Sequence, residues 1–360
     1  MRHALARRVV SGILAGDGFG QRAVTHALVA SLSDRAECPD DLRRTLDGSA
    51  DTIGSDSAAP YLGVLNQRPI PRDERDLCAQ LAPTLIDHPS DTGLNLASLL
   101  SLVEVWPHVA SDERPLLRLR FLNGLIARRS PAGSFVTRDT LCAWQRQLQT
   151  TAGDTPPTVA TLQSLLDEPT AQGAYRRIAE HLGPSVDLKT LNHVLGALAI
   201  QVMLRFHDRD GTALQVLLGT VACEQLVAWM PPEHLAILTS QLAHQLWWCR
   251  HESSLPPVLV CIDPSSAPMV EAVTSGDVTL AQRAARVEAR VSEQFWESAW
   301  RLVTASIKRQ DDEWPSALRL VSAIAWRTGS QAVSPDDAAA LAAVLAAYAH
   351  HRSASATTPR

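Results

Sequence analysis

The chain has 360 residues, 46% of them hydrophobic, and a net charge of −5, which fits a globular protein and disfavours a general nucleic-acid binder with a basic face. No apolar run approaches the ~20 residues that cross a bilayer, so we expect no membrane partner. The six cysteines stand singly, without a C-x-x-C pair. They support neither a zinc knuckle nor a thioredoxin-type site, and we expect reduced thiols in the cytoplasm.

Helical periodicity accounts for the N-terminal half of the chain, which we place at residues 1–155. A first helix ends near Ala15, a second carries His26, and a third begins at Cys38. Gly48–Pro60 is the longest predicted loop. The further helices expected in this half are Arg72–Ile86, Leu94–Val105, Pro115–Ala127 and Thr137–Leu148.

The stretch Thr151–Pro157 is the most linker-like and separates this half from a C-terminal helical half, residues 156–352, and a disordered tail, 353–360. We expect the two halves to form one integrated domain. The helices predicted beyond the linker are Thr158–Leu166, Ala171–Leu182, Leu188–Phe206, Thr212–Met230, His234–Cys249, Leu280–Lys308, Trp314–Thr328 and Asp336–His350. Only Pro257–Ile262 resembles a strand, and it has no predicted partner. The sequence therefore predicts an all-α fold, a large irregular helical bundle with a central cavity.

The predicted helix Leu188–Phe206 is apolar on most of its faces, so we expect other helices to surround it. His193 falls in an apolar row of this helix, where an imidazole needs a partner or a cavity. Gly196 and Ala197, one turn on, leave a notch beside His193 that a ligand could enter.

Metal binding is not expected. His244, Trp248 and His251 lie on one stripe of a predicted helix, but two turns separate the histidines by ~10 Å. Two nitrogens that bind one zinc lie only ~4 Å apart. The stripe is typical of core packing or of an aromatic pocket, and core packing is the commoner outcome.

His26 and His193 are the candidate catalytic residues, since each lies among apolar and small residues on a predicted helix. A partly desolvated neutral imidazole is a good general base near neutral pH. The alternative is a buried histidine bonded to a backbone carbonyl, which is the commoner role.

Three short motifs occur in order along the chain: Thr25-His26-Ala27-Leu28-Val29, Asn192-His193-Val194-Leu195-Gly196 and Asp311-Asp312-Glu313-Trp314. In this layout the chain resembles the questin oxidase-like family. Two further histidines of the family are replaced, by Asn95-Leu96-Ala97-Ser98 and by Trp314-Pro315. The resemblance implies a helical oxidoreductase that uses NADPH and O₂ in a Baeyer–Villiger-type oxidation of a planar polyketide. It also implies catalytic roles for His26 and His193 and substrate contacts from Asn192, Gly196 and Trp314.

We therefore expect an oxidoreductase that acts on an aromatic or polyketide natural-product intermediate. Two alternatives stay open. One is a cofactor-independent isomerase or cyclase that uses His193 as the base in the same pocket. The other is a non-catalytic helical binding or interaction protein.

Overall fold

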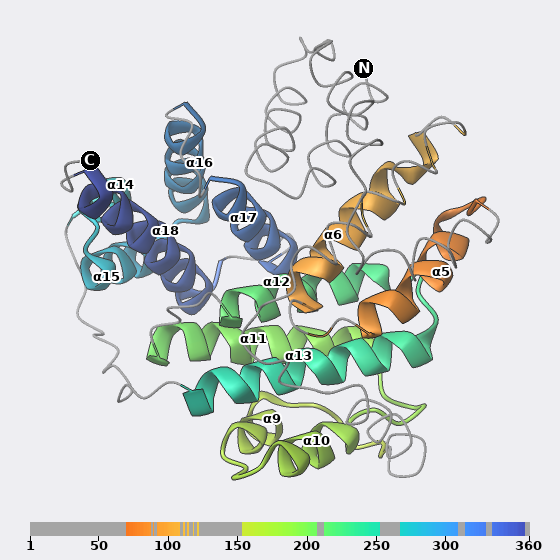
Figure 1. Cartoon of the computed structure of the whole chain (residues 1–360). Coiled ribbons are helices and arrows are strands. Elements are labelled where there is room, and N and C mark those ends of the chain that lie inside the picture. The colour runs from red at the N-terminus through yellow and green to blue at the C-terminus, as the bar shows by residue number, and fades with distance from the viewer. Residues whose placement is uncertain are drawn as a thin grey trace.

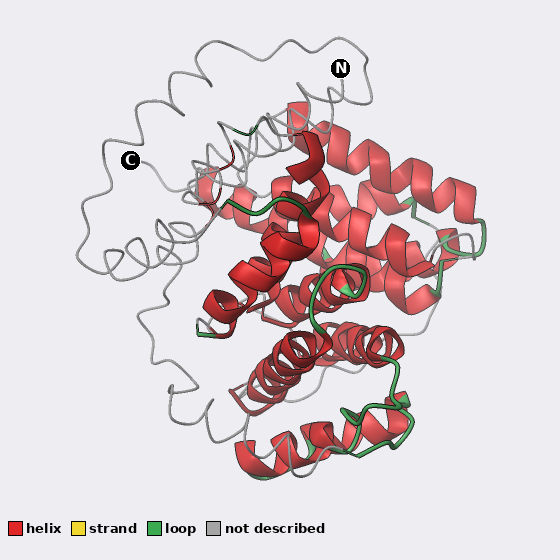
Figure 2. Ribbon diagram, turned by 90° about the vertical axis from the view of Figure 1, so that its right-hand side faces the viewer, coloured by secondary structure: helices red, strands yellow, loops and turns green. Residues whose placement is uncertain are grey.

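A computed structural model describes residues 70–87, 89, 92–108, 111, 114, 118, 121, 153–206, 212–252, 267–308, 314–328 and 333–356. Within these ranges the chain forms helices joined by turns, with no strand, and the predicted all-α class is confirmed (Figures 1 and 2). The elements expected before residue 70, those expected between residues 122 and 152, and the strand-like run Pro257–Ile262 lie outside the described residues.

In chain order the helices are α5 (Glu74–Ile86), α6 (Thr92–Val105), the short 3-10 helix η2 (Trp106–His108), α9 (Val159–Leu166), α10 (Ala171–Ala179), α11 (Leu188–Phe206), α12 (Thr212–Leu226), α13 (Pro232–Glu252), α14 (Met269–Thr274), α15 (Val278–Glu288), α16 (Ser292–Lys308), α17 (Trp314–Thr328) and α18 (Pro335–Ala356). Helices α11 and α17 have the predicted bounds. Most other predicted ends are within a few residues of the observed ones.

The predicted helix Leu280–Lys308 is wrong in one respect, because the structure divides it into α15 and α16. The N–H groups of Arg290 and Val291 bond the carbonyls of Val287 and Glu288, three residues back, and close α15 with a tight turn. The turn leaves the carboxylate of Glu288 at the end of α15, where Oε1 accepts from Met269 N at 2.7 Å and caps α14. Sequence reasoning missed α14, a helix of six residues.

The C-terminal helix is longer than expected. Because α18 runs to Ala356, residues 353–356 are helical and do not belong to a disordered tail. Residues 357–360 lie outside the described part of the chain.

Helices α11, α12 and α13 form the centre of the described bundle, and each of the three packs against the other two (Figure 1). Helices α9 and α10 lie against α13, while α17 contacts α12 and α18 contacts α11. Helix α5 packs on α13 and α6 packs on α12. Helix α11 therefore has neighbours on several sides, as its apolar composition predicts, and helices from both predicted halves share one core.

Two glycines allow α6 and α12 to cross at very short distance. A Cβ atom at Gly93 would overlap the backbone carbonyl of Gln215, and one at Gly219 would lie 2.7 Å from the Cα atom of Gly93. Larger residues at these positions would push the helices apart. This crossing joins the predicted N-terminal half to the centre of the bundle.

Buried glutamines on α13 fasten the segment that connects α5 to α6. Gln241 Nε2 donates to the Ile86 carbonyl at 3.0 Å, and Gln245 Nε2 donates to the Pro89 carbonyl at 2.6 Å. Gln241 also accepts from the Thr92 hydroxyl at 3.2 Å. These side chains satisfy backbone groups that the helix ends leave without a partner, which is why polar residues occur in this core.

Across the described residues, no helix combines the length and the apolar character that a membrane span requires.

Candidate functional site

Asn192 and His193, adjacent polar residues of α11, point in opposite directions. Asn192 is fully buried, and its Nδ2 donates to Leu188 O and to Thr239 Oγ1, each at 2.9 Å. The His193 side chain is 49% exposed. The expectation that His193 lies in an apolar row is therefore wrong. Successive helical residues are turned by about 100°, and the packing of α12 and α13 takes Asn192 inward and leaves His193 at the surface.

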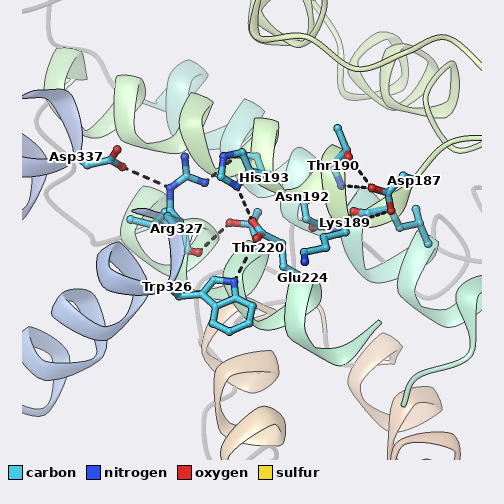
Figure 3. A network of polar contacts seen from close by, with 12 residues as sticks. Asp187, Lys189, Thr190, Asn192, His193, Thr220, Glu224, Trp326, Arg327 and Asp337 are labelled. Carbon is cyan, nitrogen blue, oxygen red and sulfur yellow. Dashed lines mark hydrogen bonds and ion pairs between the residues drawn. The ribbon is translucent and has the colours of Figure 1, made fainter. Parts of the chain in front are cut away.

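His193 faces a buried carboxylate from the neighbouring helix (Figure 3). Its Nδ1 lies 3.5 Å from Oε1 of Glu224, whose side chain is only 3% exposed. The other oxygen, Oε2, accepts from Trp326 Nε1 at 3.3 Å. One carboxyl group of α12 thus bonds an indole from α17 and lies beside an imidazole from α11, while its Oε1 makes no hydrogen bond to the described residues.

Helix α17 also reaches the backbone of His193. Arg327 Nη1 donates to the His193 carbonyl at 2.9 Å, and Arg327 Nε donates to Asp337 Oδ1 at 3.4 Å. The Arg327 side chain is 5% exposed. Asp337 is held in turn by Ser334, whose Oγ accepts from Asp337 N at 3.0 Å and donates to Asp337 Oδ2. The buried guanidinium therefore links α11, α17 and the start of α18.

The notch at Gly196 is present, but protein atoms face it. A Cβ atom at Gly196 would lie 2.6 Å from Arg327 Nη1 and 2.8 Å from Thr220 Oγ1. The absence of a side chain admits the guanidinium, and this corrects the expectation that a ligand approaches here. Of the residues predicted to bind substrate, Asn192 bonds Thr239 and Gly196 adjoins Arg327.

Two other predicted site residues are not placed. His26 lies outside the described residues, and Trp314 begins α17 but its side chain lies outside them. The catalytic role of His26, the substrate contact of Trp314 and the central cavity stay predictions.

Sequence reasoning missed Glu224, Trp326 and Arg327. A signal existed for Glu224, because it is the only charged residue of α12 and most of that helix is buried. Burying a carboxylate costs free energy unless the group has a partner. An isolated acidic residue in an apolar helix therefore indicates a polar partner on a neighbouring element. No comparable signal exists for Trp326, which follows a regular amphipathic pattern.

The histidine stripe of α13 is packed as an aromatic cluster. Trp247 contacts His244 at 5.6 Å and His251 at 4.5 Å between ring centroids, and its Nε1 donates to Glu168 O at 2.8 Å. His244 is buried, and burial lowers its pKa to about 4. Within the residues that the structure describes, no group of three or more His, Cys, Asp and Glu side chains is arranged to hold a metal.

The buried thiols are poorly suited to nucleophilic catalysis. Burial, with a smaller contribution from Glu74, raises the pKa of Cys78 to about 12. Burial also raises the pKa of Cys223, which lies next to Glu224 in α12. The thiolate is the reactive form, so among these groups His193 is the better candidate for chemistry.

No protein-family model matches the chain, and neither a curated protein nor a solved structure matches it.

Proposed function

We propose that the protein is an acid–base enzyme for planar aromatic or polyketide-type small molecules, with His193 as its general base. The observation that supports this proposal is the pairing of half-exposed His193 with buried Glu224 at 3.5 Å. A carboxylate on Nδ1 orients the ring and stabilises the imidazolium that forms when Nε2 takes a proton. Such contacts are often long before substrate binds and tighten in the complex.

Two reaction classes begin with this proton transfer. A cofactor-independent isomerase or cyclase needs no further reagent. An oxidation of the questin oxidase-like kind, which the sequence resemblance implies, would also use NADPH and O₂. The described residues include no strand followed by a glycine-rich loop and a helix, the arrangement that binds dinucleotides in Rossmann folds, and the buried Arg327 already bonds Asp337 and His193. The proton transfer is the step that we assign to this chain's own residues.

The proposal is tested by proton exchange at the acidic methylene of anthrone, a planar polyketide-like probe. Nuclear magnetic resonance in anaerobic D₂O would follow the loss of the methylene signal, without NADPH. We expect the wild type to accelerate the exchange and His193→Gln to lose about 10²–10⁴-fold of that rate. Glu224→Gln keeps the shape of the side chain and is expected to lose a smaller part of the rate.

His251→Gln is the matched control, because His251 is an exposed histidine of α13 outside the His193–Glu224 pair. It should exchange as the wild type does. If His193→Gln also keeps the full rate, His193 is not the base. Turnover that appears only when NADPH and O₂ are added would favour the oxidoreductase over the isomerase.

A second candidate is the non-catalytic binding or interaction protein. It is favoured by two exposed apolar residues next to Glu224: Trp326, 44% exposed, and Val227, 42% exposed. Val227 lies one turn beyond Glu224, and its N–H bonds Cys223 O at 3.2 Å. If the protein is a non-catalytic binding protein, neither the wild type nor any variant exchanges anthrone protons faster than the buffer alone.

A further inference from the structure

Helices α9 and α10 lie side by side against α13 (Figure 1), and the chain is bonded to itself where it enters and leaves this pair. Gly153 N donates to Ala179 O at 2.9 Å, and Gly183 N donates to Gly153 O at 2.7 Å. Thr155 N donates to the carbonyl of Glu180 at 3.0 Å. The segment that leads into α9 therefore lies beside the turn that follows α10, and the two segments close the α9–α10 pair into a loop with a bonded base.

Two side chains also hold this base together. His181 is 2% exposed, and its Nδ1 lies 2.7 Å from the Thr155 carbonyl, to which the ring donates because a carbonyl only accepts. The carboxylate of Asp154 accepts from Ser185 N at 3.0 Å, and hydrogen bonds from Ser185 lower the pKa of Asp154. A Cβ atom at Gly183 would overlap Asp154 Oδ1, so only glycine allows this approach. We call these contacts, between residues 153–155 and residues 179–185, the clasp.

The segment between the clasp and α9 is stiff and is anchored at its far end. Pro156 and Pro157 have fixed φ angles and favour an extended chain. Thr158 then forms a capping box with Thr161, in which each backbone N–H donates to the hydroxyl of the other residue, at 2.9 and 3.1 Å. By composition this part of the chain is the most linker-like, yet residues 153–158 are fixed at both ends.

The clasp leads directly into α11. Val186 N donates to the Gly183 carbonyl at 3.1 Å, and the next residue, Asp187, begins the turn into the helix. The Asp187 carboxylate accepts from Lys189 N at 3.1 Å and from Thr190 N at 3.2 Å, as an N-cap side chain does. The cap of α11 is therefore one residue away from a backbone that the clasp holds in place.

We propose that the clasp is a coupling device, which joins the segment before α9, the turn after α10 and the first turn of α11 into one rigid unit. A hinge needs backbone that can change its φ and ψ angles, whereas residues 153–158 are hydrogen-bonded or proline. A displacement of the chain at Gly153 then reaches α11 and is not absorbed by a flexible linker. The proposal goes beyond the proposed function, because it depends on neither His193 nor Glu224.

Hydrogen exchange of the full-length protein, followed by mass spectrometry, tests the coupling. Gly183→Ala places a Cβ atom 2.6 Å from Gly153 O and over Asp154 Oδ1, so it opens the clasp from a position outside α11. We expect the amides of residues 189–192 to exchange about 10-fold faster than in the wild type, because their cap is no longer held. Peptides from α12 should keep their wild-type rates.

Gly173→Ala is the matched control, because it changes a glycine of α10 whose new Cβ atom would meet the Glu168 side chain and not the clasp. It should leave exchange at residues 189–192 unchanged. Asp154→Ala opens the clasp more gently by removing the acceptor for Ser185 N, and should accelerate the same amides by about 3-fold. If Gly183→Ala accelerates exchange in every peptide, the protein has unfolded globally and Asp154→Ala is the deciding variant.

Limited digestion with proteinase K gives a second measurement. We expect the native wild type to resist cleavage within residues 153–158 and Gly183→Ala to be cut there. First cleavage of the native wild type within these residues would overturn the clasp. Exchange at residues 189–192 that is the same in Asp154→Ala as in Gly173→Ala would overturn the coupling, as would an acceleration confined to residues 179–185. None of these outcomes depends on turnover, so they are separate from the test of the proposed function.

Discussion

The guanidinium of Arg327 donates to the backbone carbonyl of His193 at 2.9 Å, over the position where Gly196 has no side chain. A carbonyl oxygen has two lone pairs and can accept this bond in addition to its helical one. Arg327 therefore fixes the backbone at His193 while Trp326, its neighbour in sequence, bonds the carboxylate that faces the imidazole. Two consecutive residues of α17 thus hold both members of the His193–Glu224 pair.

Gly196→Ala tests this arrangement. In an ordinary helix the change stabilises by roughly 0.5–1 kcal/mol. Here the new Cβ would lie 2.6 Å from Arg327 Nη1, so the guanidinium must move away from the His193 carbonyl. We expect a loss of about 1–3 kcal/mol in the free energy of unfolding, measured with urea.

A double-mutant cycle separates the contact from other effects. With Arg327→Ala in the background, Gly196→Ala should cost less than it does in the wild type, because only Thr220 Oγ1 remains close, at 2.8 Å. A Gly196→Ala protein that is more stable than the wild type would show that Arg327 does not occupy the notch.

His244 should make the protein less stable in acid. Its pKa is lowered to about 4 by burial, whereas the unfolded value is near 6.5. The unfolded chain therefore takes up a proton as the pH falls below about 6.5, and the folded protein does so only near pH 4. The stability that neutral His244 contributes to the folded protein is therefore fully present above pH 6.5. It is lost as the pH falls from about 6.5 to about 4, by on the order of 3 kcal/mol at the most.

Urea denaturation at pH 7 and pH 4.5 gives the loss of unfolding free energy on acidification, which is compared between the wild type and a His244 variant. His244→Leu should lose less stability on acidification than the wild type, because one buried proton acceptor is gone. The matched control is His251→Gln, which changes the exposed histidine of the same helix. If His244→Leu and the wild type lose the same stability between the two pH values, His244 is not buried in its neutral form.

The α6–α12 crossing predicts a ranking among glycine substitutions. Gly219→Ala places a Cβ 2.6 Å from Leu242 Cδ2 and 2.7 Å from the backbone Cα of Gly93. Because a backbone cannot move aside as a side chain can, we expect a loss of about 3 kcal/mol in stability.

Gly173→Ala in α10 is the control for this ranking. Its nearest atom would be Oε2 of the Glu168 side chain, at 2.5 Å, and that carboxylate is partly exposed and can rotate. Thermal unfolding should therefore show a much smaller change than for Gly219→Ala. Equal changes at the two positions would mean that α6 and α12 do not approach as closely as described.

Alkylation should distinguish the described cysteines. Burial holds the Cys78 pKa at about 12 and also raises that of Cys223, so neither forms thiolate at pH 8. Cys249 is half-buried near the end of α13. We expect N-ethylmaleimide to modify Cys249 first, as followed by peptide mass spectrometry, and Cys78 and Cys223 only in urea. Native Cys78 that reacts as fast as Cys249 would contradict its burial.

The class of fold and most helix ends follow from the sequence pattern. Apolar residues at helical spacing predicted α11 as Leu188–Phe206 and α17 as Trp314–Thr328, because both patterns are long and regular. The turn between α15 and α16 was not predictable in this way. It contains Ala289, Arg290 and Val291, and no glycine or proline marks it; backbone bonds and the cap that Glu288 gives to α14 produce it.

Which polar residues make the site depends on how the helices pack. A helix that is apolar on most faces has no polar side to identify its exposed side, so the sequence could not say that Asn192 turns inward and His193 outward. Packing against α12 and α13 made that choice. Glu224 stood out as a lone charge in an apolar helix, but its partners His193 and Trp326 come from α11 and α17. Contacts between distant segments depend on how helices pack in three dimensions, which local periodicity does not encode.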